Sequence, residues 1–314
     1  MRRPAVAAIA ALLGGLGACL YMAILLGSPG ALVLVYLTQL PLFAAGLWLG
    51  TGAAAIAGLT GAVILLAVAD LMAAALFVGL NAAPVVLLVR EALLARRDAA
   101  GAIAWYPAGL LGAWLAALGL AGIGVALLWL GGPGGVDEAL WHLLSRLLGP
   151  ADGQDPAERD ALASALVAVL PGMIAASWMA MTAINGCLAQ GLLSRFRANW
   201  RPSPDIALLK LPLWLPIVLL AAAAASFFDG AVRFLGVNAM VALLVPFGLA
   251  GLAVVHMAVR RLSHPAVALT AFYVFAGMFG WPLFVLAVVG VFESWLGLRR
   301  RLAPPGRSGG DIDG

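Results

Sequence analysis

Nine long apolar runs, separated by polar connections, make up most of the 314-residue chain. Most of these runs have the length of about 20 residues that an α-helix needs to cross a bilayer. The pattern therefore predicts an all-α fold, a polytopic bundle of transmembrane helices with about nine to ten spans and a transporter-like architecture. The runs cover residues 4–26, 31–49, 53–69, 71–94, 105–130, 161–193, 213–228, 234–259 and 265–298.

Composition leads to the same class. Hydrophobic residues make up 64% of the chain and charged residues 10%, whereas about a quarter of a soluble domain is charged. The solvent of this chain is therefore the lipid bilayer, and its net charge of +4 reflects loop placement and not nucleic-acid binding. We expect one integral membrane domain over residues 1–302 and a disordered tail over 303–314, which lacks core-forming residues.

The first run carries a lipoprotein-like box, Leu16-Gly17-Ala18-Cys19, but continues past it to Leu26. That length exceeds the apolar core of a signal peptide, so we expect a retained first helix. Cys19 and Cys187 both fall inside apolar runs, and this pattern predicts buried small side chains without a disulfide.

Arginine-rich connections predict the orientation of the chain. With Arg2 and Arg3 inside, the basic connections 90–98, 195–210 and 260–264 also fall inside, as the positive-inside rule requires. The acidic stretch 136–160 then lies outside, and leucines spaced at i, i+3, i+4 and i+7 predict an interfacial amphipathic helix within it. Abundant Ala, Gly and Arg with a single lysine suggest a G+C-rich bacterial genome, so we expect the bacterial inner membrane.

The last run leaves two alternatives. It is interrupted at Gly280-Trp281-Pro282 and ends at Arg299-Arg300-Arg301. A hairpin of two short spans places those arginines and both termini in the cytoplasm, whereas one long kinked helix places them outside. The charge rule favours the hairpin.

The densest polar connection starts at Arg195 and includes two further arginines, a tryptophan and an aspartate. We interpret Ser203-Pro204-Asp205 as a helix start with serine at the N-cap. Two interpretations remain open: an aromatic and arginine anchor at the headgroups, or a contact surface for a partner subunit. The candidate contact residues are Arg195, Arg197, Trp200, Arg201 and Asp205.

No catalytic or cofactor motif occurs, and the three histidines lie in different segments. We therefore expect no enzyme, no cofactor and no metal site. Polar groups inside the runs are more informative, because hydrocarbon penalises them unless they pair or face a cavity. Those considered were Gln39, Asp70, Asn81, Asn185, Gln190, Asp229, Arg233, Asn238, His256 and Glu293. Glu293 is expected to pair near the final arginines, and the deeper amides Asn81, Asn185 and Asn238 are candidate ligand-binding residues; the alternative for them is hydrogen bonding between helices.

Small residues recur every four positions, for example at Ala10-Gly14-Ala18 and at Ala54-Gly58-Ala62. Such stripes allow close helix approach, either within the chain or against a partner membrane subunit.

Several ordered motifs over residues 5–302 resemble the YybS-like family of predicted bacterial membrane proteins, whose function is unknown. They include Pro41 to Gly50, Ala83 to Leu88, Arg201-Pro202-Ser203-Pro204 with Leu211 to Leu215, and Val289 to Trp295. The pattern is also similar to substrate-capturing membrane subunits of energy-coupling-factor transporters. That resemblance implies a small molecule bound between helices and a partner subunit docked on small-residue faces.

We therefore expect a small-molecule-binding or transport-related membrane subunit. The alternative is a non-transporting structural or assembly protein that contacts cytoplasmic partners through its arginine-rich loops. A lipid-directed enzyme lacks a nucleophile and base in this sequence.

Overall fold

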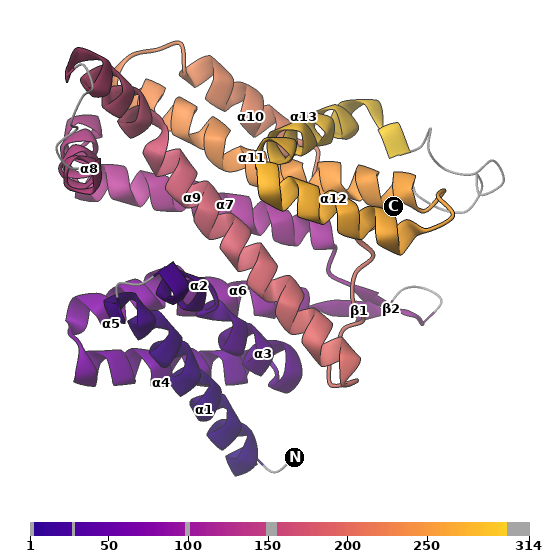
Figure 1. Cartoon of the computed structure of the whole chain (residues 1–314). Helices are drawn as coiled ribbons and strands as arrows, with labels where there is room; N and C mark the ends of the chain where they lie inside the picture. Colours follow the sequence, from indigo (N-terminus) through magenta and orange to yellow (C-terminus); the bar gives the residue numbers. More distant parts are fainter. Residues whose placement is uncertain (1–2, 27–28, 98–100, 149–155, 300–314) are drawn as a thin grey trace. The chain divides into compact units, whose positions relative to one another are not determined.

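The computed structural model describes residues 3–26, 29–97, 101–148 and 156–299, and the predicted tail 303–314 lies outside them. Helices dominate these residues (Figure 1). The α-helices are α1 Arg3–Met22, α2 Pro29–Tyr36, α3 Gln39–Leu49, α4 Thr51–Val68, α5 Leu71–Phe77, α6 Ala83–Ala92, α7 Ala108–Trp129, α8 Pro133–Leu148, α9 Pro156–Arg195, α10 Trp214–Ala225, α11 Gly230–Val259, α12 Pro265–Phe279 and α13 Trp281–Leu296. The short elements are the 3₁₀ turns η1 Ala23–Leu26 and η3 Ile206–Leu208, the π turn η2 Val78–Ala82, and the strands β1 Ala95–Arg97 and β2 Ile103–Trp105.

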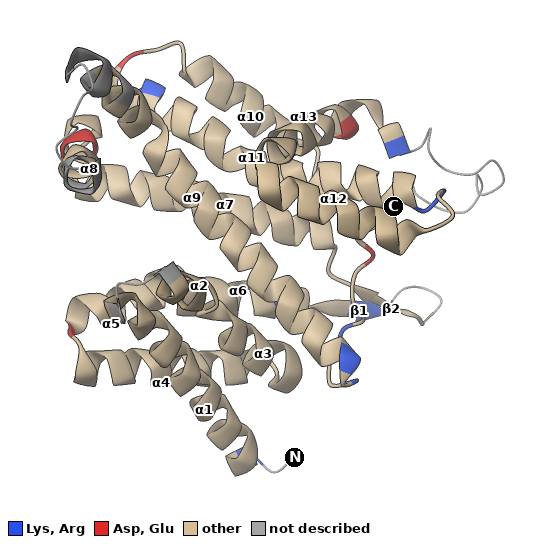
Figure 2. Cartoon of the chain, viewed as in Figure 1, with Lys and Arg blue, Asp and Glu red and all other residues tan. Residues whose placement is uncertain are grey.

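The helices confirm the polytopic membrane bundle. Within the described residues, seven helical segments are long and apolar enough to span a bilayer. Helices satisfy their backbone groups internally, which hydrocarbon requires. Figure 2 shows most of the charged residues at helix ends and in connections. The seven segments are Arg3–Leu25, Gly30–Leu49, Thr51–Val68, Leu71–Ala92, Ala108–Trp129, Ala163–Arg195 and Gly230–Val259; α10 is a shorter apolar helix.

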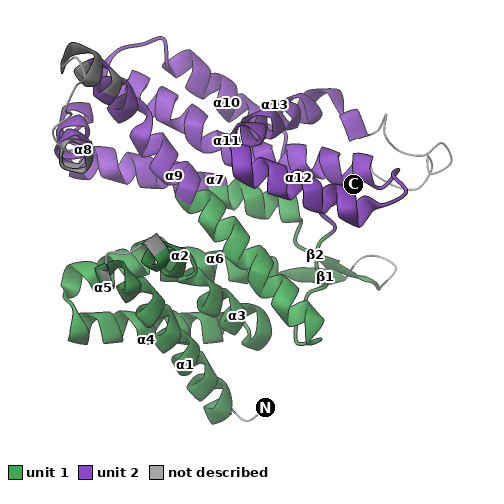
Figure 3. Cartoon of the chain, viewed as in Figure 1, with its two compact units in different colours: residues 1–115, 178–204 green, residues 116–177, 205–314 purple. Residues whose placement is uncertain are grey.

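The chain divides into two compact units (Figure 3). Unit 1 comprises residues 1–115 and 178–204, and unit 2 comprises residues 116–177 and 205–314. Helices α7 and α9 each contribute residues to both units. The expected single domain over 1–302 stays a prediction.

In unit 1, α1 packs against α4 through small residues. A methyl group on Gly14 would overlap the backbone carbonyl of Ala57, so the two backbones lie almost in contact. Ala10 and Ala18 on the same stripe are also buried. The stripe predicted in the first span is therefore occupied inside the chain, and it is no free surface for a partner.

In unit 2, α11 and α13 cross at two glycines. A methyl group on Gly251 would overlap the carbonyl of Leu286, and one on Gly290 would overlap the carbonyl of Phe247. Helices α12 and α13 meet at a bend of 115° at Gly280, which has a positive φ of 69°. The last apolar run is therefore two short helices and not one long rod (Figure 1).

Three local expectations are corrected. Cys19 and Cys187 are exposed on their helices and not buried. The second run breaks at Leu37-Thr38, ahead of Pro41, which lies in the first turn of α3. The basic connection after α6 contains a two-stranded antiparallel ladder that pairs Ala95 with Trp105. The helix predicted in the acidic stretch is present as α8.

Candidate functional site

Unit 1 contains two interrupted helices whose breaks free backbone carbonyls. At the α2–α3 break, the Leu40 N–H donates to Leu37 O at 3.0 Å and not to Tyr36 O, its partner in a regular helix. The Tyr36 carbonyl accepts a hydrogen bond from Nδ2 of Asn185 at 2.6 Å. An amide from α9 thus caps the end of α2.

The second interruption is the π turn between α5 and α6. Pro84 has no N–H to donate to the carbonyl four residues earlier, which belongs to Leu80. That carbonyl instead accepts hydrogen bonds from Gln39 Nε2 at 2.9 Å and from Trp178 Nε1 at 2.8 Å. Residues from α3 and α9 therefore meet at the π turn.

One face of α9 supplies the remaining groups. Trp178, Thr182 and Asn185 are spaced at i, i+4 and i+7, which places them on the same side of the helix. The Thr182 hydroxyl donates to Trp178 O at 2.9 Å, and Asn185 Nδ2 also donates to Met181 O at 2.8 Å. We call Thr38, Gln39, Trp178, Thr182 and Asn185 the unit-1 polar cluster; all five side chains are uncharged.

Three buried oxygen atoms of this cluster have no hydrogen-bond partner. They are Thr38 Oγ1, Gln39 Oε1 and Asn185 Oδ1, in side chains with exposed fractions of 1%, 0% and 1%. Leaving such a group unpaired costs about 1–3 kcal/mol. Unpaired buried polar atoms are rare in native proteins and are candidates for ligand contact.

The three candidate amides have different environments. Asn185 belongs to the cluster, whereas Asn81 follows Leu80 on the π turn, is buried, and makes no side-chain hydrogen bond in the described part of the chain. Asn238 lies in unit 2, where its Oδ1 accepts from Gly172 N at 2.7 Å and its Nδ2 donates to Ala168 O at 3.1 Å and Phe234 O at 2.9 Å.

The bonds of Asn238 lie beside a proline inside α9. Gly172 N and Ala168 O are four residues apart, as donor and acceptor of a regular helix are, and Pro171 lies between them without an N–H of its own. The Asn238 amide bridges this donor and acceptor. Both ends of the Asn238 amide therefore make hydrogen bonds within unit 2, and its predicted role in ligand binding stays a prediction.

The arginine loop after α9 divides into exposed and buried residues. Arg195, Arg197 and Trp200 are exposed, whereas Arg201 is buried and donates from its guanidinium to Ala92 O at 3.0 Å, at the end of α6. Burial lowers the pKa of Arg201. The guanidinium of Arg201 is thus bound inside unit 1, and its predicted role in partner contact stays a prediction.

Arg197 ends α9 in a left-handed conformation, with φ of 54°. The Ala198 N–H donates to Leu193 O at 2.9 Å and the Arg197 N–H to Ser194 O at 3.2 Å, which together form a Schellman motif. Glycine is the usual residue at this position, so an arginine there is conformationally strained. The motif ends the helix and turns the chain into the following loop.

The second segment of unit 2 begins with Asp205, which caps η3 by accepting a hydrogen bond from Ala207 N at 3.0 Å. The predicted cap, Ser203, is instead within hydrogen-bonding distance of the Ser194 hydroxyl, at 2.8 Å. Asp205 also pairs with Arg260, at the end of α11, at 2.5 Å. The pKa of Asp205 is lowered chiefly by the hydrogen bond from Arg260, while partial burial opposes the shift.

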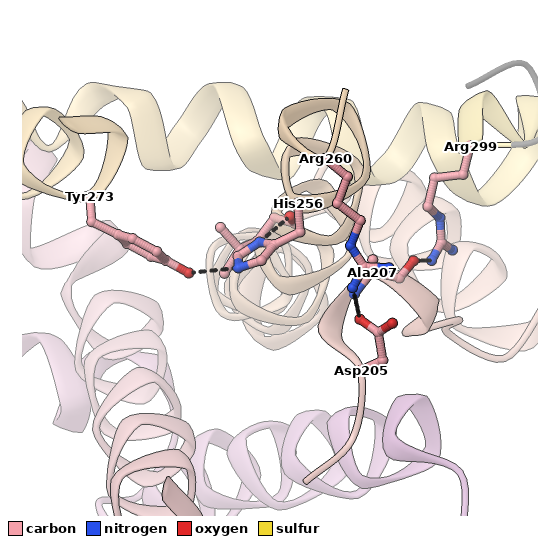
Figure 4. A network of polar contacts seen from close by, with 7 residues as sticks. Asp205, Ala207, His256, Arg260, Tyr273 and Arg299 are labelled. Carbon is pink, nitrogen blue, oxygen red and sulfur yellow. Dashed lines mark hydrogen bonds and ion pairs between the residues drawn. The ribbon is translucent and has the colours of Figure 1, made fainter. Parts of the chain in front are cut away.

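A second ion pair in unit 2 ties the end of α13 to the same segment. Arg299 donates from Nε to Glu293 Oε1 at 2.7 Å and from its guanidinium to Ala207 O at 2.8 Å. His256 Nδ1 lies 2.9 Å from Leu252 O, which can only accept, so Nε2 is free to accept from the Tyr273 hydroxyl at 3.4 Å. Figure 4 shows the contacts of Arg299 with Ala207, of Arg260 with Asp205 and of His256 with Tyr273. The expected pairing of Glu293 with the final arginines is present, in a buried environment.

Sequence reasoning missed Thr38, Trp178 and Thr182. The available signal was Pro84, which identifies Leu80 as a carbonyl in need of a donor, but no pattern pairs that carbonyl with a tryptophan 98 residues away. Among the described residues, no group of three His, Cys, Asp or Glu side chains is arranged to hold a metal ion.

Residues 149–294 match the model of a family described as "Predicted membrane protein (DUF2232)". The match covers slightly less than half of the chain, including all of α9 to α12 and most of α13. No curated protein and no solved structure matches. The chain is thus a membrane protein with several candidate spans, and the matched family carries no assigned activity.

Proposed function

We propose that this protein is a small-molecule-binding, transport-related subunit of the bacterial inner membrane whose ligand site is the unit-1 polar cluster. The observation that carries the proposal is the set of three unpaired oxygens on fully buried side chains beside two interrupted helices. Transporters commonly bind substrates and coupling ions at such helix interruptions. The resemblance to energy-coupling-factor substrate-capturing subunits motivates the same assignment.

Native mass spectrometry of the full chain, released from a mild detergent, tests this proposal. We expect a small molecule to accompany the wild-type protein and to be lost from Asn185→Leu and Gln39→Met, which remove the unpaired amide oxygens. Asn199→Ala is the matched control, because its amide donates only to the loop carbonyl of Arg201. A wild-type protein with no bound molecule in any preparation would contradict the proposal.

A second function, as an assembly protein, is favoured by the exposed loop after α9. Arg195, Phe196, Arg197 and Trp200 present charge and aromatic surface together. Under this function, Arg195→Ser combined with Arg197→Ser abolishes the cellular phenotype and partner recovery while insertion remains normal. Arg201 stays unchanged in this test, because loss of its buried hydrogen bond would disturb unit 1 itself. Unchanged phenotype and recovery would exclude this function.

A further inference from the structure

The orientation of the two amides in the unit-1 polar cluster is determined by carbonyl groups. Asn185 Nδ2 faces Tyr36 O and Met181 O, and Gln39 Nε2 faces Leu80 O. Rotating either amide by 180° would place an oxygen against a carbonyl oxygen, which is repulsive. The two free amide oxygens are therefore held as acceptors.

The third free atom, Thr38 Oγ1, belongs to the residue beside Gln39. Three links bring these oxygens into one region. Thr38 and Gln39 are adjacent in the chain, and Asn185 binds the carbonyl of Tyr36, two residues before Thr38. Gln39 and Trp178 both donate to Leu80 O, and Trp178 lies on the same face of α9 as Asn185. An anion would meet mainly acceptor oxygens here. A suitable ligand must bring positive charge or hydrogen-bond donors.

The backbone adds negative potential. Tyr36 is the last residue of α2, so the cluster lies at the carboxyl end of that helix, which carries partial negative charge. The π turn contributes the Leu80 carbonyl. Interrupted helices in transporters use such carbonyl ends to coordinate Na⁺.

From these observations we infer that the unit-1 polar cluster binds a monovalent cation, with Thr38 Oγ1, Gln39 Oε1 and Asn185 Oδ1 as its side-chain ligands. Divalent cations favour carboxylate ligands, and the five cluster side chains include none. The cation is either an inorganic ion such as Na⁺ or the ammonium end of an organic molecule. This inference rests on the proposed site in unit 1, and it specifies what that site accepts.

Thermal unfolding of the purified full chain in nanodiscs tests the inference. The protein is titrated with sodium, potassium or methylammonium chloride, and choline chloride keeps the ionic strength constant. We expect a saturable rise in Tm with at least one of the first three salts, because a ligand that binds only the folded state stabilises it. A sodium-specific rise indicates an inorganic ion, and a methylammonium-specific rise indicates an organic ammonium group.

Variants distinguish this site from general salt effects. Thr38→Val and Asn185→Leu should each weaken the apparent affinity at least tenfold, whereas Thr38→Ser, which keeps the hydroxyl group, should retain it. Asn199→Ala should leave it unchanged. Thr38→Val keeps the test informative if Asn185→Leu fails to fold, because Thr38 Oγ1 makes no hydrogen bond to the described residues.

Identical Tm values in all salts, or equal shifts in wild type and variants, would overturn the cation assignment. A small molecule retained by wild type and lost from Asn185→Leu, without any salt effect, would leave the proposed function standing and reject the cation. A salt effect removed by Thr38→Val, without a co-purifying molecule, would support the cation and reject the small-molecule site.

Discussion

Amide side chains in this protein repair interrupted helices. Asn185 caps the carbonyl of Tyr36, Gln39 caps that of Leu80, and Asn238 binds Gly172 N and Ala168 O on either side of Pro171. In hydrocarbon no water is available to satisfy these backbone groups, so a side chain must do so. The amides differ in which atoms are hydrogen-bonded. Both the oxygen and the nitrogen of the Asn238 amide make hydrogen bonds, whereas the amide oxygens of Gln39 and Asn185 have no partner among the described residues.

The structural role of Asn238 predicts coupling to Pro171. Asn238→Leu leaves Gly172 N and Ala168 O unpaired, and we expect a loss of about 2 kcal/mol in the free energy of unfolding. In a Pro171→Ala background a regular helix can form, the two backbone groups can pair with each other, and the same substitution should cost less than half as much. Unfolding of the four proteins in detergent measures this coupling. Equal costs in both backgrounds would show that Asn238 acts independently of the interruption.

Asp205 predicts an acid-sensitive contact in unit 2. Its carboxyl pKa is lowered by the hydrogen bond from Arg260, so the stabilisation is present above the ordinary carboxyl pKa of about 4 and is lost as the pH falls through the lowered value. Because the Asp205 and Arg260 side chains are 37% and 53% exposed, we expect a small effect.

The test compares Tm between about pH 3 and pH 7. Asp205→Asn should lose less stability on acidification than wild type, since it cannot titrate. Asp229→Asn is the control, because Asp229 at the start of α11 makes no capping bond and should keep the wild-type dependence. An Asp205→Asn profile that follows wild type would contradict the role given to the ion pair.

At the scale of elements, close helix contacts depend on glycine. The crossing of α11 and α13 places Gly251 against Leu286 O and Gly290 against Phe247 O. We expect Gly251→Ala and Gly290→Ala each to reduce stability by about 1–3 kcal/mol, because the added methyl overlaps backbone that cannot move aside cheaply. Loss of Tm in detergent is the measurement.

Gly248→Ala is the matched control on α11, since a methyl there meets no atom within 4 Å. It should be neutral or stabilising by up to about 1 kcal/mol, as alanine favours helix over glycine. Equal losses of stability from Gly248→Ala and Gly251→Ala would mean that α11 does not tolerate alanine at either position. The close contact with α13 would then not explain the loss at Gly251.

The elements themselves were largely predictable, and their partners were not. Apolar length and turn residues predicted the spans and the helix α8, because helical hydrogen bonding is local. The second apolar run breaks at Leu37-Thr38 and continues through Pro41, since proline is tolerated in the first turn of a helix. The Asn185–Tyr36 contact joins residues 149 positions apart, and hydropathy carries no information about such a pair.

At the scale of the whole molecule, the open question was the path of the last apolar run. Arg260, nine residues beyond Gly251, pairs with Asp205, and Arg299, nine residues beyond Gly290, binds Ala207 O. Since these two glycines mark the α11–α13 crossing, both helices lead from it to the same segment. This agrees with the 115° bend between α12 and α13 and favours the hairpin over a kinked single span.

The hairpin predicts that both ends of the α12–α13 pair lie on one face of the membrane. In a background with both native cysteines replaced by alanine, Ser263→Cys and Leu298→Cys should react with a membrane-impermeant maleimide only in inverted vesicles. Ala139→Cys in α8, from the acidic stretch, should react only in right-side-out vesicles. The first reason is that the arginines flanking α12 and α13 stay in the cytoplasm. The second is that Arg299, which forms a buried ion pair with Glu293, also binds Ala207 O and so holds the end of α13 at the 205–207 segment. If Ser263→Cys and Leu298→Cys react from opposite faces, α12 and α13 cross the membrane as one bent span and the return of Arg299 to that segment is wrong.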